Sequence, residues 1–216
     1  MKSTRLLIPI LVLVIACTAY ANDSNSELLK AAKVGDVEGV KGLLKKGVDV
    51  NGKDDNGRTA LMEAAYWGHP DVVNLLLSQG IDLNAKDKQG NTALILSAQP
   101  GHIKIVQALL SKGADTKAKN SQGRTAFIEA AARGHAEAVK ALLEAGANVN
   151  DVTGSGRTAL MLAAYWGNAD TVRLLLEKGA DVNMKDKQGY TALDYARSEK
   201  HKEVEELINK AKSTPH

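Results

Sequence analysis

Several residue types are scarce in this 216-residue chain, and each shortage excludes a class of protein. Because Cys17 is the only cysteine, no disulfide can form within the chain, so the fold is not a disulfide-stabilised scaffold. Two tryptophans and one phenylalanine are few for this length. Small residues and leucine are abundant instead, as expected when short helices pack closely.

An excess of one charge sign is also missing. The chain has 28 lysines and arginines against 25 aspartates and glutamates. Removing residues 1–21 takes away Lys2 and Arg5 and no acid, which leaves 26 basic against 25 acidic side chains. Nucleic-acid-binding proteins normally show a marked basic excess, so the sequence argues against that class of partner.

The first 21 residues are predicted to be a secretory signal peptide and not a membrane span. The apolar run over residues 6–16 has eleven residues, whereas a membrane-spanning helix needs about 20. Its length and the basic residues before it are typical of a signal peptide. No membrane span is therefore expected.

Two processing signals overlap behind this apolar run, and both alternatives stay open. Ala-Tyr-Ala at residues 19–21 favours cleavage before Asn22, and Val-Ile-Ala-Cys at residues 14–17 resembles a bacterial lipoprotein signal with Cys17 lipidated. We expect an exported protein, periplasmic or secreted in the first case and a lipid-anchored envelope lipoprotein in the second.

The main positive feature of the chain is a 33-residue period. Two columns of glycine and one of threonine keep this step along most of the sequence. The columns are Gly47, Gly80, Gly113, Gly146 and Gly179; Gly57, Gly90, Gly123, Gly156 and Gly189; and Thr59, Thr92, Thr125, Thr158 and Thr191. A fixed period of this size indicates stacked copies of one small unit, none of which buries its own apolar face alone.

The first half of each unit is predicted to be a turn and a short helix. In the copy at residues 54–86, Asp-Asp-Asn-Gly at 54–57 has the composition of a turn. Thr59 suits a helix N-cap, because its hydroxyl can accept a hydrogen bond from an unpaired N–H. A helix is expected over residues 60–67, ended by Gly68.

The second half is predicted to be another helix. Pro70 suits its first position, where the missing N–H costs nothing. Residues 72–77 supply an apolar face, and Gly80 stops the helix in the left-handed conformation. One copy differs, because Pro100 falls at the end of its first helix and should shorten that helix.

This pattern of Asp-x-x-Gly-x-Thr-x-Leu, Ala-Ala-x-x-Gly-His and Leu-Leu-x-x-Gly-x-Asp-x-Asn resembles the ankyrin repeat. The resemblance covers about residues 26–212 and implies an all-α solenoid of helix-turn-helix units with β-turn tips, about six repeats including atypical end caps. The expected repeats are 26–53 (opening cap), 54–86, 87–119, 120–152, 153–185 and 186–212 (closing cap). Residues 22–25 form a short linker before them and residues 213–216 a tail.

A larger duplication lies inside the array. Residues 57–94 and 156–193 are identical at 27 of 38 positions and are three units apart. We infer that an ancestral three-unit block was doubled. The two blocks should then superpose better than blocks shifted by one unit.

No catalytic, cofactor or metal site is expected. His69, His102, His135 and His201 share one column, but the same column holds Asp36 and Asn168. These three residue types can all cap a helix, and the column directly precedes the second helix, so capping is the favoured interpretation. The loose Gly-x-Gly-x-x-Ala pattern at residues 154–159 follows no predicted strand, which argues against nucleotide binding.

The aromatic pairs Tyr66-Trp67 and Tyr165-Trp166 are the favoured partner-binding residues. Each pair closes the first helix of its copy, where the resemblance implies a concave binding face. Other copies have Gln-Pro or Ala-Arg there, so the fold does not demand aromatic residues. Tyrosine and tryptophan are common interface anchors, yet each ring could instead pack as local core, and both interpretations remain open.

Basic residues form further columns beside these pairs. Arg58, Arg124 and Arg157 share one, Arg133 lies nearby, and Lys53, Lys86, Lys119 and Lys185 share another. They either steer an acidic partner or form an ordinary solvated rim.

The sequence thus predicts a monomeric, non-enzymatic protein-interaction module of the bacterial cell envelope. It would bind another exported or envelope protein through Tyr66, Trp67, Tyr165 and Trp166, supported by Arg58, Arg124, Arg133 and Arg157. The alternative is an anionic envelope polymer or lipid headgroup, bound through the arginine and lysine columns.

Overall fold

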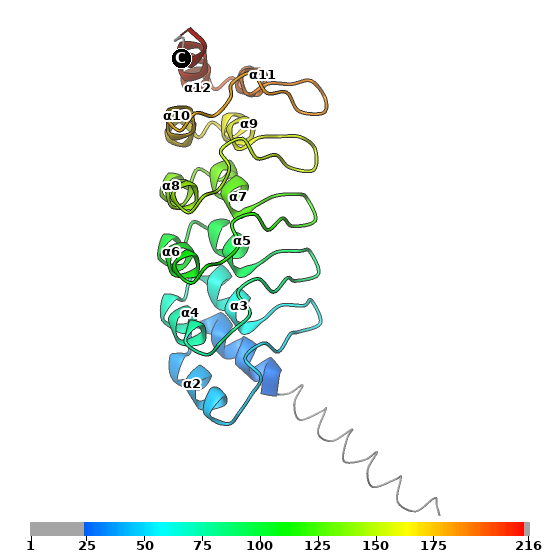
Figure 1. Cartoon of the computed structure of the whole chain (residues 1–216), viewed down its shortest axis with the longest axis vertical. Coiled ribbons are helices and arrows are strands. Elements are labelled where there is room, and N and C mark those ends of the chain that lie inside the picture. The colour runs from blue at the N-terminus through cyan, green and yellow to red at the C-terminus, as the bar shows by residue number, and fades with distance from the viewer. Residues whose placement is uncertain (1–23, 214–216) are drawn as a thin grey trace, which may run out of the picture.

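The computed structural model describes residues 24–213 (Figure 1). The expected signal peptide at 1–21, with Cys17 and the cleavage point before Asn22, lies outside the described residues, as does the end of the expected tail. Between residues 24 and 213, no helix combines the length and apolar character needed to cross a membrane. The described part has no β-strand, only isolated bridges from Lys53 to Thr59 and from Val152 to Thr158.

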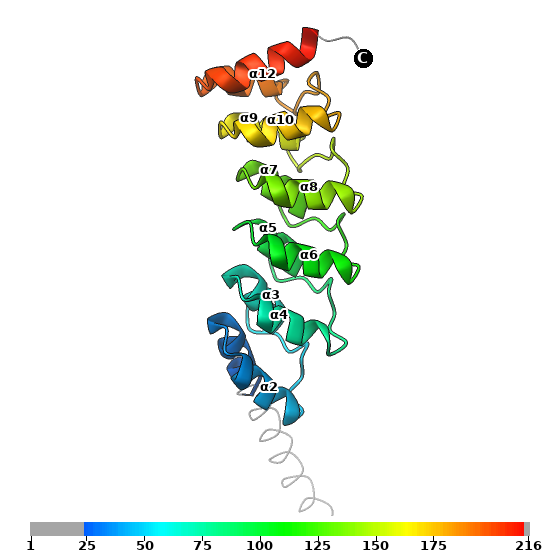
Figure 2. The same ribbon diagram turned by 90° about the vertical axis from the view of Figure 1, so that its left-hand side faces the viewer.

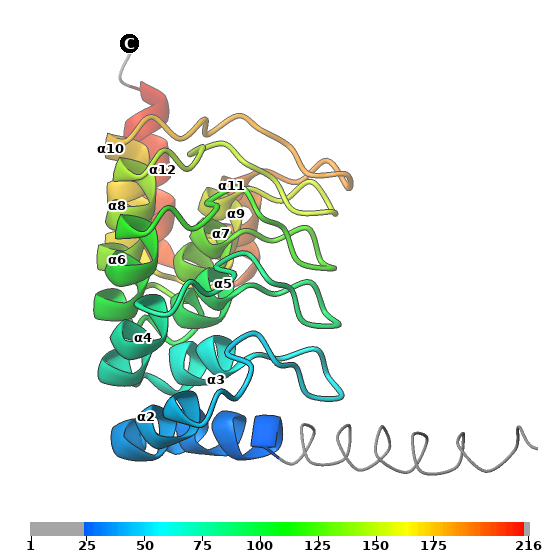
Figure 3. The same ribbon diagram turned by 60° about the horizontal axis from the view of Figure 1, so that its bottom comes forward.

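Six helix pairs stack along one axis, as the sequence predicted (Figures 1 and 2). The first helices of the pairs are residues 24–34, α3 (Ala60–Trp67), α5 (Ala93–Ala98), α7 (Ala126–Ala132), α9 (Ala159–Tyr165) and α11 (Ala192–Ser198). The second helices are α2 (Val37–Lys45), α4 (Pro70–Leu77), α6 (Ile103–Ser111), α8 (Ala136–Glu144), α10 (Ala169–Glu177) and α12 (Lys202–Ser213). The turns between successive pairs project together on one side (Figure 3).

Local sequence signals set the helix ends. The Thr59 hydroxyl accepts a hydrogen bond from the Met62 N–H at 3.3 Å, and the threonines of the next four repeats cap their helices in the same way. Such a cap contributes about 0.5–2 kcal/mol to stability. Gly68 ends α3 with a φ of 81°, a conformation that favours glycine. These predictions, and the predicted helix over residues 60–67, are confirmed.

The predicted effect of Pro100 is also confirmed. Helix α5 ends at Ala98 after six residues, whereas α3, α7, α9 and α11 have seven or eight. Gln99, directly before the proline, nevertheless keeps helical dihedral angles, with φ −58° and ψ −53°, and its N–H donates to the Ile95 carbonyl. The helix is shorter because proline has no N–H to continue the hydrogen-bond ladder, and not because Gln99 leaves the helical conformation.

The core is one continuous apolar spine from Leu28 to Ile208. Pairs of alanines such as Ala64 and Ala65 are fully buried between neighbouring first helices, where their small size allows close packing. Leucine and valine from the second helices, Leu76 among them, cover the other side. Each repeat therefore depends on its neighbours for burial.

Hydrogen bonds join each turn to the next. The Lys88 N–H donates to the Asn56 carbonyl at 2.8 Å, and the same contact recurs at the following three turns. Gly57 allows this approach, because a Cβ there would lie 3.3 Å from the backbone of Asp87. The turns thus form a connected row beside the first helices.

Candidate functional site

The two residues of each aromatic pair have different environments. Tyr66 and Tyr165 are half-buried against the apolar core. Trp67 and Trp166 are 49% and 62% exposed. Within each pair the rings meet edge to face, with centroids 5.4 Å apart in the first pair and 5.1 Å in the second. The tyrosines therefore pack locally, while the tryptophans are left available at the surface.

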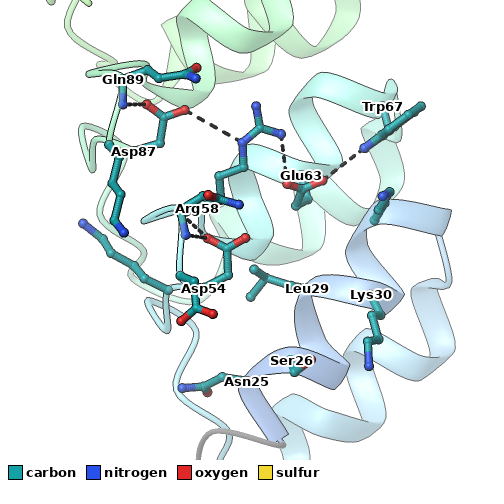
Figure 4. A pocket seen from close by; sticks show the side chains of 15 residues that line it. Asn25, Ser26, Leu29, Lys30, Asp54, Arg58, Glu63, Trp67, Asp87 and Gln89 are labelled. Atoms are coloured by element: carbon teal, nitrogen blue, oxygen red, sulfur yellow. Dashed lines mark hydrogen bonds and ion pairs between the residues drawn. The ribbon is translucent and has the colours of Figure 1, made fainter. Parts of the chain in front are cut away.

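A buried glutamate holds Trp67 in place (Figure 4). The indole Nε1 of Trp67 donates to Glu63 at 3.0 Å, and Arg58 binds the other oxygen of Glu63 at 3.0 Å. Arg58 also lies 3.8 Å from a carboxylate oxygen of Asp87, in the next turn. Glu63 is only 7% exposed, so this ion pair is largely shielded from water. The Lys33 ammonium lies 5.2 Å from the Trp67 ring centroid, within cation–π range.

The second aromatic pair also lies near an arginine that faces a carboxylate, but in the part of the chain that the structure describes it has no buried glutamate beside its tryptophan. Arg157 lies 3.6 Å from a carboxylate oxygen of Asp186 and 5.0 Å from the centre of the Tyr195 ring. Leu162 stands where the first pair has Glu63, and within residues 24–213 the Trp166 indole makes no hydrogen bond. Trp166 is therefore less constrained than Trp67.

Asp186 and Tyr195 perturb one another. Burial opposes ionisation of Asp186, but the Tyr195 hydroxyl, the N–H groups of Tyr190 and Gln188, and Arg157 outweigh it. The pKa of Asp186 therefore lies below its ordinary value of 3.8. Burial and the hydrogen bond to Asp186 raise the pKa of the Tyr195 hydroxyl above 10.0. Arg157 moderates the latter shift.

The predicted arginines are all paired with carboxylates of the fold itself. Besides Arg58 and Arg157, Arg124 and Arg133 lie 3.5 and 3.6 Å from Glu129, which is 2% exposed. The burial of Glu63 and Glu129 was not predicted from the sequence. One feature of the sequence could have indicated it. These glutamates occupy a repeat position that holds leucine in two other repeats, at Leu96 and Leu162.

Three of the predicted lysines join neighbouring repeats. Lys53, Lys86 and Lys119 each donate to a backbone carbonyl 33 residues further along, at 3.3, 3.1 and 2.9 Å. Lys119 also pairs with Asp151 at 2.8 Å. Lys185 is exposed.

The capping role predicted for the histidine column is wrong. His69, His102 and His135 precede second helices but make no capping hydrogen bond. Instead, the Nε2 atoms of these residues and of His201 contact carbonyl oxygens 36 residues earlier, near the ends of the preceding first helices, at 2.9 to 3.2 Å. The ring nitrogen reaches across the repeat boundary to a carbonyl that has no partner within its own helix.

The other two residue types of this column behave differently from one another. Asn168 bridges to the Ala132 carbonyl at 3.0 Å, as the histidines do. Asp36 does cap its helix, by accepting from the Gly39 N–H at 2.9 Å. Across residues 24–213, no three His, Cys, Asp or Glu side chains gather in a way that would hold a metal ion.

An open hollow of about 750 Å³ lies beside Trp67. The helix at residues 24–34 forms one wall, and the turns at residues 53–56 and 87–89 form the other, with the Arg58 side chain between them (Figure 4). Its lining is mixed in charge and is more polar than apolar. The hollow therefore suits a polar or charged ligand.

Comparison with known proteins identifies the repeat. Two family models, described as ankyrin repeats in three copies and ankyrin repeats in many copies, match the chain. The first matches residues 7–87, 28–120 and 85–153, and the second matches residues 142–196. No curated protein matches the sequence.

A solved structure is also similar to the chain. It is an ankyrin repeat domain from Acinetobacter baumannii AYE, with 37% sequence identity and a TM-score of 0.77. The match covers 86% of this chain and 97% of that one.

Proposed function

The chain belongs to the ankyrin repeat family, and on that premise we propose that it is a non-enzymatic module that binds another exported or envelope protein. Ankyrin repeats are generally protein-interaction modules. The binding site is the concave face of the stack, formed by the first helices and the turns. Its anchors are Trp67 and Trp166, each supported by the tyrosine that precedes it.

The observation that carries this proposal is the exposure of both tryptophans at equivalent positions. A tryptophan that is 49% or 62% exposed leaves a large apolar surface in water, which a partner would cover. The hydrogen bond to Glu63 already orients Trp67, so less side-chain freedom is lost on binding. Tryptophan is among the residues most enriched at interface hot spots.

The envelope location rests on the sequence of residues 1–21. A basic start, a short apolar run and a small-residue cleavage site together favour export. Whether processing occurs before Asn22 or at Cys17 decides between a free and a lipid-anchored protein. Mass spectrometry of the mature N-terminus distinguishes these outcomes.

The anionic polymer or lipid headgroup is the less favoured ligand. Its support was the arginine and lysine columns, yet the guanidinium groups face carboxylates, and Lys53, Lys86 and Lys119 bind carbonyls of neighbouring repeats. These groups already have partners. Binding that is lost with added salt but does not depend on either tryptophan would favour the polymer instead.

The experiment is affinity purification from an envelope fraction with the immobilised protein. Trp67→Ala and Trp166→Ala should each weaken partner capture by about 1 kcal/mol or more, a fivefold or greater loss of affinity. Asn74→Ala, at an exposed position on the second helix α4, is the control and should capture normally. Folded variants that both retain full capture would reject the two anchors.

A further inference from the structure

The two aromatic patches are related by the duplication but differ in charge. Both retain the tryptophan, the arginine of the same repeat (Arg58 or Arg157) and the Asp-Lys-Gln turn of the next repeat, which begins at Asp87 or Asp186. Three lysines around Trp67 have no basic counterpart 99 residues later. Lys30, Lys33 and Lys53 are replaced there by Glu129, Ala132 and Val152. The N-terminal patch alone is thus surrounded by ammonium groups.

These lysines line the hollow beside Trp67. Lys30 and Lys33 come from the helix at residues 24–34, Lys53 from the start of the facing turn, and Lys88 from the next turn. Figure 4 shows Lys30 and Trp67 on the side opposite Asp87 and Gln89, with Arg58 and Glu63 between them. A ligand in the hollow would therefore meet basic groups from two sides.

The acidic residues of the hollow differ in how far they offset the lysine charges, because some are buried and others are exposed. Glu63 and Asp87 are buried, and both carboxylates face Arg58. The exposed charges are four ammonium groups against the carboxylates of Asp54 and Asp55, while the hollow as a whole, with its buried groups, holds five basic and four acidic side chains. Within residues 24–213, Lys30 and Lys88 have neither an ion pair nor a side-chain hydrogen bond. Their charges are available to a ligand.

We propose that this hollow binds an acidic, extended peptide segment of the partner protein, with carboxylates at Lys30, Lys33 and Lys88 and the chain lying against Trp67. This inference rests on the proposed function and names the chemistry of its partner. The side chains of Asn25, Ser26 and Gln89 line the same hollow and offer neutral polar groups for peptide amides. Asp54 and Asp55 would repel a uniformly anionic polymer, so a peptide of mixed polarity fits better.

The duplication supplies a matched control. Lys88 and Lys187 hold the same position in their turns, are both exposed, and donate their backbone N–H to the preceding turn at 2.8 and 3.1 Å. Lys88→Glu and Lys187→Glu are therefore the same substitution in the same local structure. Only the first is expected to weaken binding, by about tenfold, since it places a like charge opposite the peptide.

The test is NMR titration of the full chain with a decapeptide of alternating glutamate and alanine. The two tryptophans give separate indole N–H signals, assigned with Trp→Phe variants. We expect the Trp67 signal to shift and the Trp166 signal to stay, with weaker binding in Lys30→Glu and Lys88→Glu but not in Lys187→Glu. A glutamine–alanine peptide should leave both signals unchanged.

Other outcomes overturn the proposal. Equal shifts of both indoles, equal effects of Lys88→Glu and Lys187→Glu, or no binding of the acidic peptide would each reject it. So would phosphatidylglycerol vesicles that move the Trp67 signal when the peptide does not. These failures leave tryptophan-dependent capture of an envelope protein intact, so they are distinguishable from failure of the proposed function.

Discussion

The imidazole Nε2 of His102 lies 3.2 Å from the carbonyl oxygen of Tyr66, in the preceding repeat. His201 makes the same contact with Tyr165, three repeats further along, at 3.0 Å. The two aromatic pairs are therefore attached at their backbone to the next repeat. Because the last carbonyls of a helix have no partner within it, these bonds satisfy acceptors and couple neighbouring repeats together.

Removal of one such bridge should destabilise the stack. We expect His135→Ala to lower the free energy of unfolding by about 1–2 kcal/mol, because it leaves the Gln99 carbonyl without its 2.9 Å partner. His135→Asn should retain more stability, since Asn168 makes the same bridge. Urea unfolding followed by circular dichroism measures both. A stability of His135→Ala equal to that of the unchanged protein would contradict a stabilising role for this bridge.

Glu129 offers a test of the buried ion pairs. Its side chain is 3% exposed and faces Arg124 and Arg133, whereas leucine occupies its column at Leu96 and Leu162. Replacing a whole buried ion pair by apolar residues is often neutral or stabilising, whereas removing one partner is costly when the other charge stays buried. Here the arginines left behind are 29% and 51% exposed, so both can be solvated. We expect Glu129→Leu to leave the free energy of unfolding unchanged or higher.

Removing a partner of Glu129 should have the opposite effect. Arg124→Ala leaves the buried carboxylate with one arginine and should cost about 1–3 kcal/mol. Thermal unfolding at neutral pH compares the variants. A large loss in Glu129→Leu, with none in Arg124→Ala, would contradict this account of the pair.

Asp186 should contribute to acid sensitivity. Its pKa is lower in the folded protein than its ordinary 3.8, so its stabilising contribution is present above about pH 3.8 and is lost as pH falls through the folded value. Asp186→Asn keeps an acceptor for the turn, as Asn120 does in another repeat. The free energy of unfolding of Asp186→Asn should be lower than that of the unchanged protein at pH 7. It should also fall less between about pH 5 and pH 2. Urea midpoints across this range test it, and identical pH profiles would contradict it.

Tyr195 should make the stability of the fold depend on pH in the alkaline range. Its pKa is raised above 10.0, so its contribution is complete below that pH and is lost as pH rises through the folded value. Tyr195→Phe removes the ionising group and should reduce the loss of stability above pH 10. Ultraviolet titration of the tyrosines, compared between the two proteins, locates the transition. A normal pKa for the missing tyrosine would contradict the assignment.

The sequence predicted those features whose cause is local. Thr59 and Gly68 act on N–H and carbonyl groups within a few residues, and Pro100 lacks the N–H that would continue its helix, so pattern alone located these helix ends. The His102 bridge spans 36 residues and depends on how one repeat packs on the next. The recurrence of histidine at this repeat position could be read from the sequence, but the carbonyl that it contacts could not.

The site shows the same division. Trp67 was identified from the sequence, but its bond to Glu63 and the hollow beside it depend on three-dimensional packing. The sequence left open whether the aromatic pairs are surface or core. Packing divides them, because Tyr66 lies half-buried against the apolar core while the Trp67 side chain is half-exposed at the surface.

Site-specific photo-crosslinking tests the central claim most directly. A photoreactive p-benzoylphenylalanine is placed at Tyr190, a 53% exposed residue in the turn before α11 on the proposed binding face, or at Asn74 on the exposed side of α4. Both anchors remain in each protein, which is irradiated in the envelope fraction. We predict a discrete protein adduct from position 190 and none from position 74. Adducts from position 74 alone would place the partner on the opposite side of the stack and contradict the account.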